Sequence, residues 1–365
     1  MERPDPPILT IGPTPRLGTM AARLELHYAS PLGHHRHYLW LDPDAPHRPP
    51  SLPDPIAGQP QILPIHAFGL DRPRLGRFYP AKVLHGVRTA GPVFRVVEVT
   101  AETFTVDFSH PLANQTVQWL IGDETSLEGN SRGLGRPLDL LPWAGLEQPL
   151  AGKTIDFAEL GSWQRLDDHP DGIFYATPRR LLHLDEVCSS RVQALYQALV
   201  PSDGKILDLM AGWRSHLSHP SVIGLGMNEV ELADNPQLQG WQVQDLNENP
   251  HLPFADGYFT AVVCTASLEY LLQPLAVLAE VRRVLVPGGT LAVTFSDRWF
   301  PPKVIGLWTK LHPMERLSWV LHLLATSGFR HLHSQLERGL ARPPGDRYSS
   351  QRLEMDPLWA AWGQV

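Results

Sequence analysis

The second half of the sequence alternates between short apolar runs and stretches with helical spacing, and this alternation limits what the chain can fold into. Four runs are apolar enough to be buried strands: Ile206–Leu209, Ser221–Leu225, Ala261–Cys264 and Leu291–Phe295. Helical spacing is found in Glu186–Leu199 and Pro274–Leu285, and Leu358–Gly363 is a last apolar run. Strands that alternate with helices form crossover units, so this half predicts an α/β fold with a doubly wound, mostly parallel sheet.

The first half has a different texture. Proline is dense in residues 1–80, which excludes long helices there. Alternating and β-branched stretches predict short strands at Arg23–Tyr28, Arg77–Leu84, Val93–Val99, Thr103–Phe108 and Thr116–Ile121. The predicted organisation is therefore a flexible N-terminus (1–20), a small mainly-β domain (21–122), a linker (123–170) and the α/β domain (171–365).

Composition narrows the function. The 365 residues are 43% hydrophobic and carry a net charge of −7, which gives a real core and disfavours a nucleic-acid-binding surface. The two cysteines, Cys188 and Cys264, lie far apart in the sequence, so neither a disulfide framework nor a cysteine zinc site is predicted. Histidines cluster at His34, His35 and His37 without paired ligands, so no metal is expected. With no signal-peptide pattern and no apolar run of about 18 residues, we expect a soluble, cytoplasmic protein without a membrane segment.

The stretch KILDLMAGWRSHL at residues 205–217 predicts a ligand site. It reads as a strand, an acid at Asp208, a small-residue turn at Ala211 and Gly212, and the start of a helix. In doubly wound sheets, ligands bind beyond the carboxyl ends of the strands, where a helix N-terminus faces them. Asp208 would hold a turn amide or a cationic ligand group, or else only cap the helix.

A second candidate segment is the loop after the short strand Trp241–Val243. Asp245 is placed to accept a hydrogen bond from an adenine amino group, and Leu246 to pack on the ring. The alternative for Asp245 is an ordinary turn residue.

Taken in order, these segments resemble the class I S-adenosylmethionine-dependent methyltransferases. The pieces are Asp208 with Gly212, GLGMN at 224–228, Asp245, LPFADGYFTAVVC at 252–264 and LVPGGTLAVTFS at 285–296. The resemblance covers about residues 170–365 and implies a Rossmann-like fold, S-adenosyl-L-methionine as cofactor, and transfer of its methyl group to an unidentified acceptor. It implies these cofactor-binding residues: Asp208, Met210, Gly212, Asn228, Asp245, Leu246 and Ser267.

The chain departs from the family pattern at four glycine or acid positions, one of which is Thr260 in place of the aspartate of the F-D-x-V motif. Of the usual three-glycine turn only Gly212 remains, and Met210 and Arg214 would either narrow the pocket or reroute the turn. The position of the ribose-binding acid is taken by Gly226, so Asn228 is the expected neutral substitute.

The resemblance also implies residues on the acceptor side and a lid. A base is needed only if the acceptor must lose a proton, and the candidates after the fourth strand are Glu269 and Tyr270. The alternative for Glu269 is an acid favoured by a helix N-terminus. The segment FYATPRRLLHLDE at 174–186 resembles one bacterial and plastid branch of the family, in which Tyr175, Arg179 and His183 would line a lid over the cofactor.

The N-terminal part carries a second resemblance. Residues 76–122 resemble the insert-in-flap module of FKBP-type prolyl isomerases, most specifically in VDFSHPLA at 106–113, and Arg23–Tyr28 resembles that fold's opening strand. The aromatic pocket of those isomerases is hard to find here. The resemblance therefore implies a chaperone-like or protein-binding module rather than a working isomerase, and it makes a protein a possible methyl acceptor.

Three other functions remain open from the sequence. The depleted turn would also fit a non-catalytic, methyltransferase-like binding protein, and the first half would fit a peptidyl-prolyl isomerase. A nicotinamide dehydrogenase is disfavoured, because no G-x-G-x-x-G follows the first strand.

Overall fold

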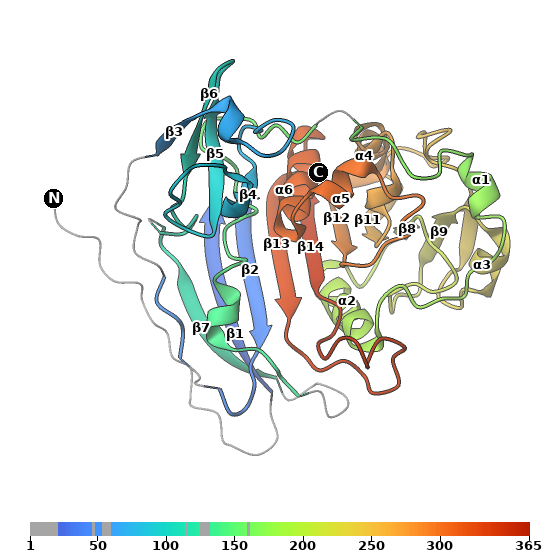
Figure 1. Cartoon of the computed structure of the whole chain (residues 1–365). Helices are drawn as coiled ribbons and strands as arrows, with labels where there is room; N and C mark the ends of the chain where they lie inside the picture. Colours follow the sequence, from blue (N-terminus) through green and yellow to red (C-terminus); the bar gives the residue numbers. More distant parts are fainter. Residues whose placement is uncertain (1–20, 46–47, 53–59, 114, 125–131, 159–160) are drawn as a thin grey trace.

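A computed structural model describes residues 21–45, 48–52, 60–113, 115–124, 132–158 and 161–365, so the predicted flexible segment 1–20 lies outside the described residues. In this part of the chain, ten strands form one sheet in the order β10-β9-β8-β11-β12-β14-β13-β2-β1-β7 (Figure 1). The strands are β1 (Ala21–Ser30), β2 (Gly33–Trp40), β7 (Gln118–Glu124), β8 (Ile206–Leu209), β9 (Val222–Gly226), β10 (Gly240–Val243), β11 (Phe259–Thr265), β12 (Leu285–Phe295), β13 (Arg330–Arg338) and β14 (Leu358–Gln364).

The C-terminal half has helices on both faces of its sheet. Strands β10, β9, β8, β11 and β12 are parallel, and β14 joins them antiparallel. The helices are α1 (Asp171–Phe174), α2 (Glu186–Leu199), α3 (Glu229–Asp234), α4 (Pro274–Val284), α5 (Gly306–Lys310) and α6 (Pro313–Thr326). In β11, Val262 belongs to the core formed with α4 and α6, whereas Val263 belongs to the core formed with α2. This alternation buries both faces, and the predicted doubly wound α/β fold is confirmed.

The helix predicted directly after the first strand is wrong. Residues 211–220, between β8 and β9, contain no helix. Side chains from the next crossover bind the backbone of this connection instead: Gln237 Oε1 accepts from Ser215 N at 3.0 Å, and Asn235 Nδ2 donates to Gly212 O at 2.9 Å. The turn beside the ligand edge is therefore held by side chains, without the dipole of a helix.

The strands of the N-terminal half divide between two sheets. β1, β2 and β7 extend the large sheet, because β2 pairs in parallel with β13 from Gly33↔Leu332 to Leu39↔Arg338. The others, β3 (Gln61–Pro64), β4 (Phe78–Pro80), β5 (Val93–Val99) and β6 (Thr103–Asp107), form a four-stranded sheet around a core of their own. The predicted strand at Arg77–Leu84 is only β4, followed by a 3-10 turn at Ala81–Val83.

The predicted linker is packed against the rest of the molecule. Within 123–170, Glu147 is fully buried and accepts a hydrogen bond from the ring of His37, whose Nε2 lies 2.9 Å from the carboxylate. The connection between the two halves is also polar: the His35 ring lies 2.8 Å from Ser334 Oγ, and Trp40 Nε1 donates to Glu337 at 2.8 Å. The large sheet thus crosses the predicted boundaries at 122 and 171, and the division into domains stays a prediction.

Candidate active site

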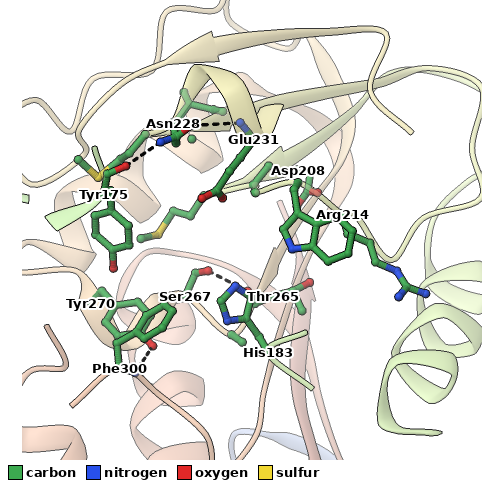
Figure 2. Close-up of a pocket in the computed structure, with 18 of the residues that line it drawn as sticks. Tyr175, His183, Asp208, Arg214, Asn228, Glu231, Thr265, Ser267, Tyr270 and Phe300 are labelled. Atoms are coloured by element: carbon green, nitrogen blue, oxygen red, sulfur yellow. Dashed lines mark hydrogen bonds between the residues drawn. The ribbon is translucent and has the colours of Figure 1, made fainter. Parts of the chain in front are cut away.

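A pocket opens beyond the carboxyl ends of β8, β9, β10 and β11, at the edge of the sheet where the sequence predicts ligands to bind (Figure 2). Ten of the predicted site residues line it: Tyr175, His183, Asp208, Met210, Gly212, Asn228, Asp245, Leu246, Ser267 and Tyr270. Two predicted residues, Arg179 and Glu269, do not. Within the described residues, no three histidine, cysteine or acidic side chains are grouped to hold a metal ion.

Asp208 lies at the end of β8 and faces the turn that follows. Its buried carboxylate accepts a hydrogen bond from the hydroxyl of Ser215, and Asn235 Nδ2 donates to the same hydroxyl at 3.0 Å. Burial raises the pKa of Asp208 to about 7. Among the roles predicted for Asp208, these contacts support that of holding the turn. The group that Asp208 binds is the hydroxyl of Ser215, not a backbone amide.

The backbone takes a left-handed conformation at two strand ends beside the pocket. Met210 has φ 59° after β8, and Ala266 has φ 48° after β11. Residues other than glycine adopt this backbone conformation at a cost of about 1–2 kcal/mol, and residues with such backbone strain concentrate at functional sites. Met210 thus keeps a left-handed turn of the kind for which glycine is the usual residue.

A close approach of two strand ends explains why no acid stands at Gly226. A Cβ there would lie 2.1 Å from Ala211 O, because Ala211 N donates to Leu225 O at 2.8 Å. Asn228, the expected substitute, is engaged by the protein. Its Oδ1 caps α3 at Glu231 N (3.1 Å), and its Nδ2 donates to Tyr175 O (2.8 Å) and to the carbonyl of the next residue. These contacts oppose a role in ribose binding, which stays a prediction.

The sequence analysis missed Glu231, which lines the pocket from the first turn of α3. Its Oε1 accepts from Arg179 N at 2.6 Å, and Figure 2 shows the carboxylate directed into the pocket. Burial raises its pKa. The signal was present: Asn228 and Glu231 have the Asn-x-x-Glu spacing of a capped helix start, which places an acid beside the end of the preceding strand.

The loop after β10 brings Asp245 and Leu246 to the pocket. Leu246 is buried, and Asp245 Oδ1 accepts from Asn247 N at 2.8 Å. Asn247 in turn donates to Asp171 Oδ2 at 2.8 Å and to Tyr270 O at 3.0 Å. Asn247 thereby fixes the loop against α1, which contains Asp171, and against the segment after β11.

The two candidates for a base, Glu269 and Tyr270, are neighbours in the segment after β11, but only one of them lines the pocket. Tyr270 lines the pocket, and its hydroxyl accepts from Phe300 N at 2.8 Å. Glu269 is fully buried outside the pocket lining, and neither of its carboxyl oxygens has a hydrogen-bond partner among the described residues. Burial raises its pKa to about 8. Ser267 lines the pocket and donates to Thr265 O at 2.8 Å.

Aromatic side chains close the pocket on the side of the predicted lid. Tyr175 and His183 line it together with Phe300, whose ring meets that of His183 edge-on at 5.3 Å. Burial lowers the pKa of His183. The guanidinium of Arg179 stacks on Phe174, with 4.0 Å from its carbon to the ring centre, behind the lining.

Residues 211–293 match the family model described as a methyltransferase domain. Over 133 residues the chain is 29% identical to the methyltransferase GfsG of Streptomyces halstedii, covering 33% of this chain and 48% of that protein. Over 101 residues it is 37% identical to the ubiquinone/menaquinone biosynthesis C-methyltransferase UbiE of Desulfotalea psychrophila, covering 24% and 40%. The matched regions thus span less than half the length of either relative.

Two solved structures match a larger share of the chain, but at lower sequence identity. A SAM-dependent methyltransferase of Thermotoga maritima, described as a possible histamine N-methyltransferase, is 16% identical with a TM-score of 0.35, covering 48% of this chain and 88% of that one. A SAM-dependent methyltransferase of Archaeoglobus fulgidus is 14% identical with a TM-score of 0.36, covering 48% and 94%.

None of these matches identifies the N-terminal half as FKBP-like, which stays a prediction. The doubly wound sheet, the order of the motifs along its ligand edge and the family match agree for the other half. The C-terminal half of the chain therefore contains a class I S-adenosylmethionine-dependent methyltransferase domain.

Proposed function

We propose that the protein transfers a methyl group from S-adenosylmethionine to an acceptor that remains to be identified. The observation that carries the proposal is the pocket itself, which joins the turn after β8, the end of β9, the loop after β10 and the segment after β11. These are four of the segments that the family motifs mark in the sequence.

The pocket suits such a cofactor on three counts. Gly226 keeps a side chain away from the approach of two strand ends, where a Cβ would meet Ala211 O, and Gly212 leaves room beside the carboxylate of Glu231. Leu246 gives a buried apolar surface for an adenine ring beside the carboxylate of Asp245. Asp208 and Met210 hold the shape of the turn, and Ser267 lies opposite them.

The chemistry asks little of the protein beyond alignment. The sulfonium of the cofactor supplies an activated methyl group: a lone pair of the acceptor forms the new bond to carbon while the carbon–sulfur bond breaks, leaving S-adenosylhomocysteine. Holding the acceptor in line and excluding water does most of the work. Tyr175, Tyr270 and Phe300 form the aromatic wall that would position the acceptor, and Tyr270 can donate its hydroxyl hydrogen there.

The test is a calorimetric titration of the full chain with S-adenosylmethionine and S-adenosylhomocysteine, together with thermal unfolding. We expect binding of both and a raised melting temperature. Asp245→Ala should weaken binding about tenfold, as expected for a lost hydrogen bond to a charged group. Glu248→Gln, an exposed acid in the same loop, is the matched control. No heat and no thermal shift with either compound would refute the proposal.

The identity of the acceptor stays open within this proposal. The resemblance of residues 76–122 to a protein-binding module makes a protein a possible acceptor, and this acceptor stays a prediction. The left-handed backbone at Met210 favours a working turn over a relic, because it keeps the conformation that the missing glycine would adopt.

A further inference from the structure

The lid, residues 175–183, contacts Phe300 through the ring of His183 and the guanidinium of Arg179, and four of its polar contacts reach one other region of the molecule. Asn228 Nδ2 donates to Tyr175 O at 2.8 Å, and Glu231 Oε1 accepts from Arg179 N at 2.6 Å. Arg180 forms an ion pair with Asp234, and Trp213 Nε1 donates to Leu181 O at 3.1 Å. Every one of these four polar partners lies either in the turn after β8 or in the first helix after β9.

Three of the four partners of the lid also line the pocket: Trp213, Asn228 and Glu231. The amide of Asn228 is used on both sides by the protein, and Trp213 uses its single N–H donor on the lid. Glu231 differs from both. One carboxylate oxygen holds the lid, and the other, Oε2, lies 3.1 Å from where a Cβ of Gly212 would stand, with no hydrogen-bond partner among the described residues.

We propose that Glu231 binds the cofactor with its free carboxylate oxygen and holds the lid with the other, so that cofactor binding and lid closure stabilise each other. This inference rests on the proposed function. A carboxylate that accepts from a hydroxyl of the ligand stays ordered and charged, and both effects strengthen its second bond, to Arg179 N. The coupling is reciprocal, because each contact lowers the cost of fixing the same side chain.

The lid carries Tyr175, which belongs to the aromatic wall proposed for the acceptor, and His183, whose ring contacts Phe300 of that wall. A lid that is more stable over the occupied pocket favours completion of the acceptor site after the cofactor has bound. The order of binding follows: cofactor first, acceptor second.

Trypsin provides a direct readout, because the lid contains two adjacent cleavage sites, after Arg179 and after Arg180. The full chain is digested with and without S-adenosylhomocysteine, and cleavage at these bonds is followed by mass spectrometry. Cleavage of a folded segment requires local opening, which a ligand that binds only the closed form suppresses by mass action. At about 100 times its dissociation constant, we expect the compound to slow cleavage at least about tenfold.

Two variants separate the two bonds of Glu231. Glu231→Gln keeps an oxygen for Arg179 N but loses the charge, so the lid contact is weakened and not lost: cleavage without ligand should rise less than in Glu231→Ala, while affinity for S-adenosylhomocysteine falls about tenfold. Glu231→Ala loses both bonds, so the lid should be cleaved faster without ligand, and saturating ligand should protect it less.

Asp234→Asn is the matched control, since Asp234 holds the lid from the same helix without lining the pocket. Because this ion pair is exposed and holds the lid only weakly, the variant should change the affinity and the ligand protection factor by less than about twofold. If S-adenosylhomocysteine binds the wild type but leaves cleavage at Arg179 and Arg180 unchanged, or if Glu231→Gln binds it as tightly as the wild type, the coupling is wrong. If the wild type does not bind it at all, the proposed function fails instead.

Discussion

Glu269 carries a carboxyl group that the fold buries without a hydrogen-bond partner among the described residues. Burial raises its pKa to about 8, and the nearby charge of Arg316 only partly opposes this. An unfolded glutamate has a pKa of about 4.3. The native state therefore holds a proton that the unfolded state has lost between these values, so this group makes the free energy of unfolding fall as pH rises from about 4.3 to about 8.

Glu269→Gln removes that titration. Relative to the wild type, the variant should become steadily more stable as pH rises through this window. Urea unfolding of both proteins at several pH values between about 5 and about 8 measures the difference. Glu248→Gln, at an exposed position, should show a nearly constant difference. A constant difference for Glu269→Gln as well would mean that the folded carboxyl titrates normally.

At the same scale, the site shows what a sequence can and cannot give. Asp208, Asp245 and Leu246 were found because strand ends in a doubly wound sheet meet at one edge. The absence of an acid at Gly226 could be seen in the sequence, but its cause is a backbone contact with Ala211 O across two strands. The inward orientation of Glu269 depends on how the segment after β11 packs, which local pattern does not encode.

Among the elements, α6 connects the four-stranded sheet to the large one through one side chain. Glu315 Oε1 accepts from Arg77 Nε at 2.7 Å and from Phe78 N at 3.0 Å, at β4. Its Oε2 accepts from His312 N at 3.2 Å and closes the capping box of α6. One buried carboxylate thus begins a helix and fixes a strand from the other half of the chain.

Glu315→Ala should therefore lower the free energy of unfolding by about 3–5 kcal/mol, the loss expected when one partner of a buried ion pair is removed. Urea unfolding monitored by circular dichroism measures it. Glu102→Gln, at an exposed acid in the turn between β5 and β6, should change it by less than about 0.5 kcal/mol. A loss of under about 1 kcal/mol for Glu315→Ala would show that the two sheets hold together without this contact.

The elements themselves divide by how local their causes are. The boundaries of α2 and β8 match the sequence expectation, because Asp185 caps α2 at Cys188 N and β8, with three apolar residues and Asp208, is completely buried. The strand β2 was missed because its histidines mask the alternation, although His35 and His37 are buried. The sequence predicts a helix after β8 that does not form. The side chains that bind that connection instead, Asn235 and Gln237, lie in the next crossover, so the local pattern does not show them.

Across the whole molecule, the pairing of β2 with β13 means that neither half of the large sheet is complete alone. Glu337 on β13 is fully buried and accepts from Trp40 Nε1 at 2.8 Å and from Arg191 Nε at 2.5 Å. Without β2, residues 171–365 would present an unpaired strand with buried polar groups at its edge.

We expect residues 171–365 expressed alone to be poorly soluble and to bind S-adenosylhomocysteine weakly, and co-expression with residues 1–170 to restore both properties. Soluble yield and calorimetry measure the two. The full chain serves as the reference. A monomeric fragment 171–365 with the affinity of the full chain would mean that the sheet tolerates the loss of β2, and it would support the predicted boundary at 171. No helix of the described residues is long and apolar enough to cross a membrane.

The strand order also determines when each strand of the large sheet can find its partner during synthesis. β14 lies between β12 and β13, and the contact between His35 and Ser334 joins residues 299 apart in the sequence. As the chain emerges from the ribosome, β2 has no partner on one side until β13 is made, and β12 and β13 stay apart until residues 358–364 follow. Contacts of such long range close slowly. The first third of the protein thus spends its synthesis with an open edge, when a holding chaperone or a wrong pairing competes for it.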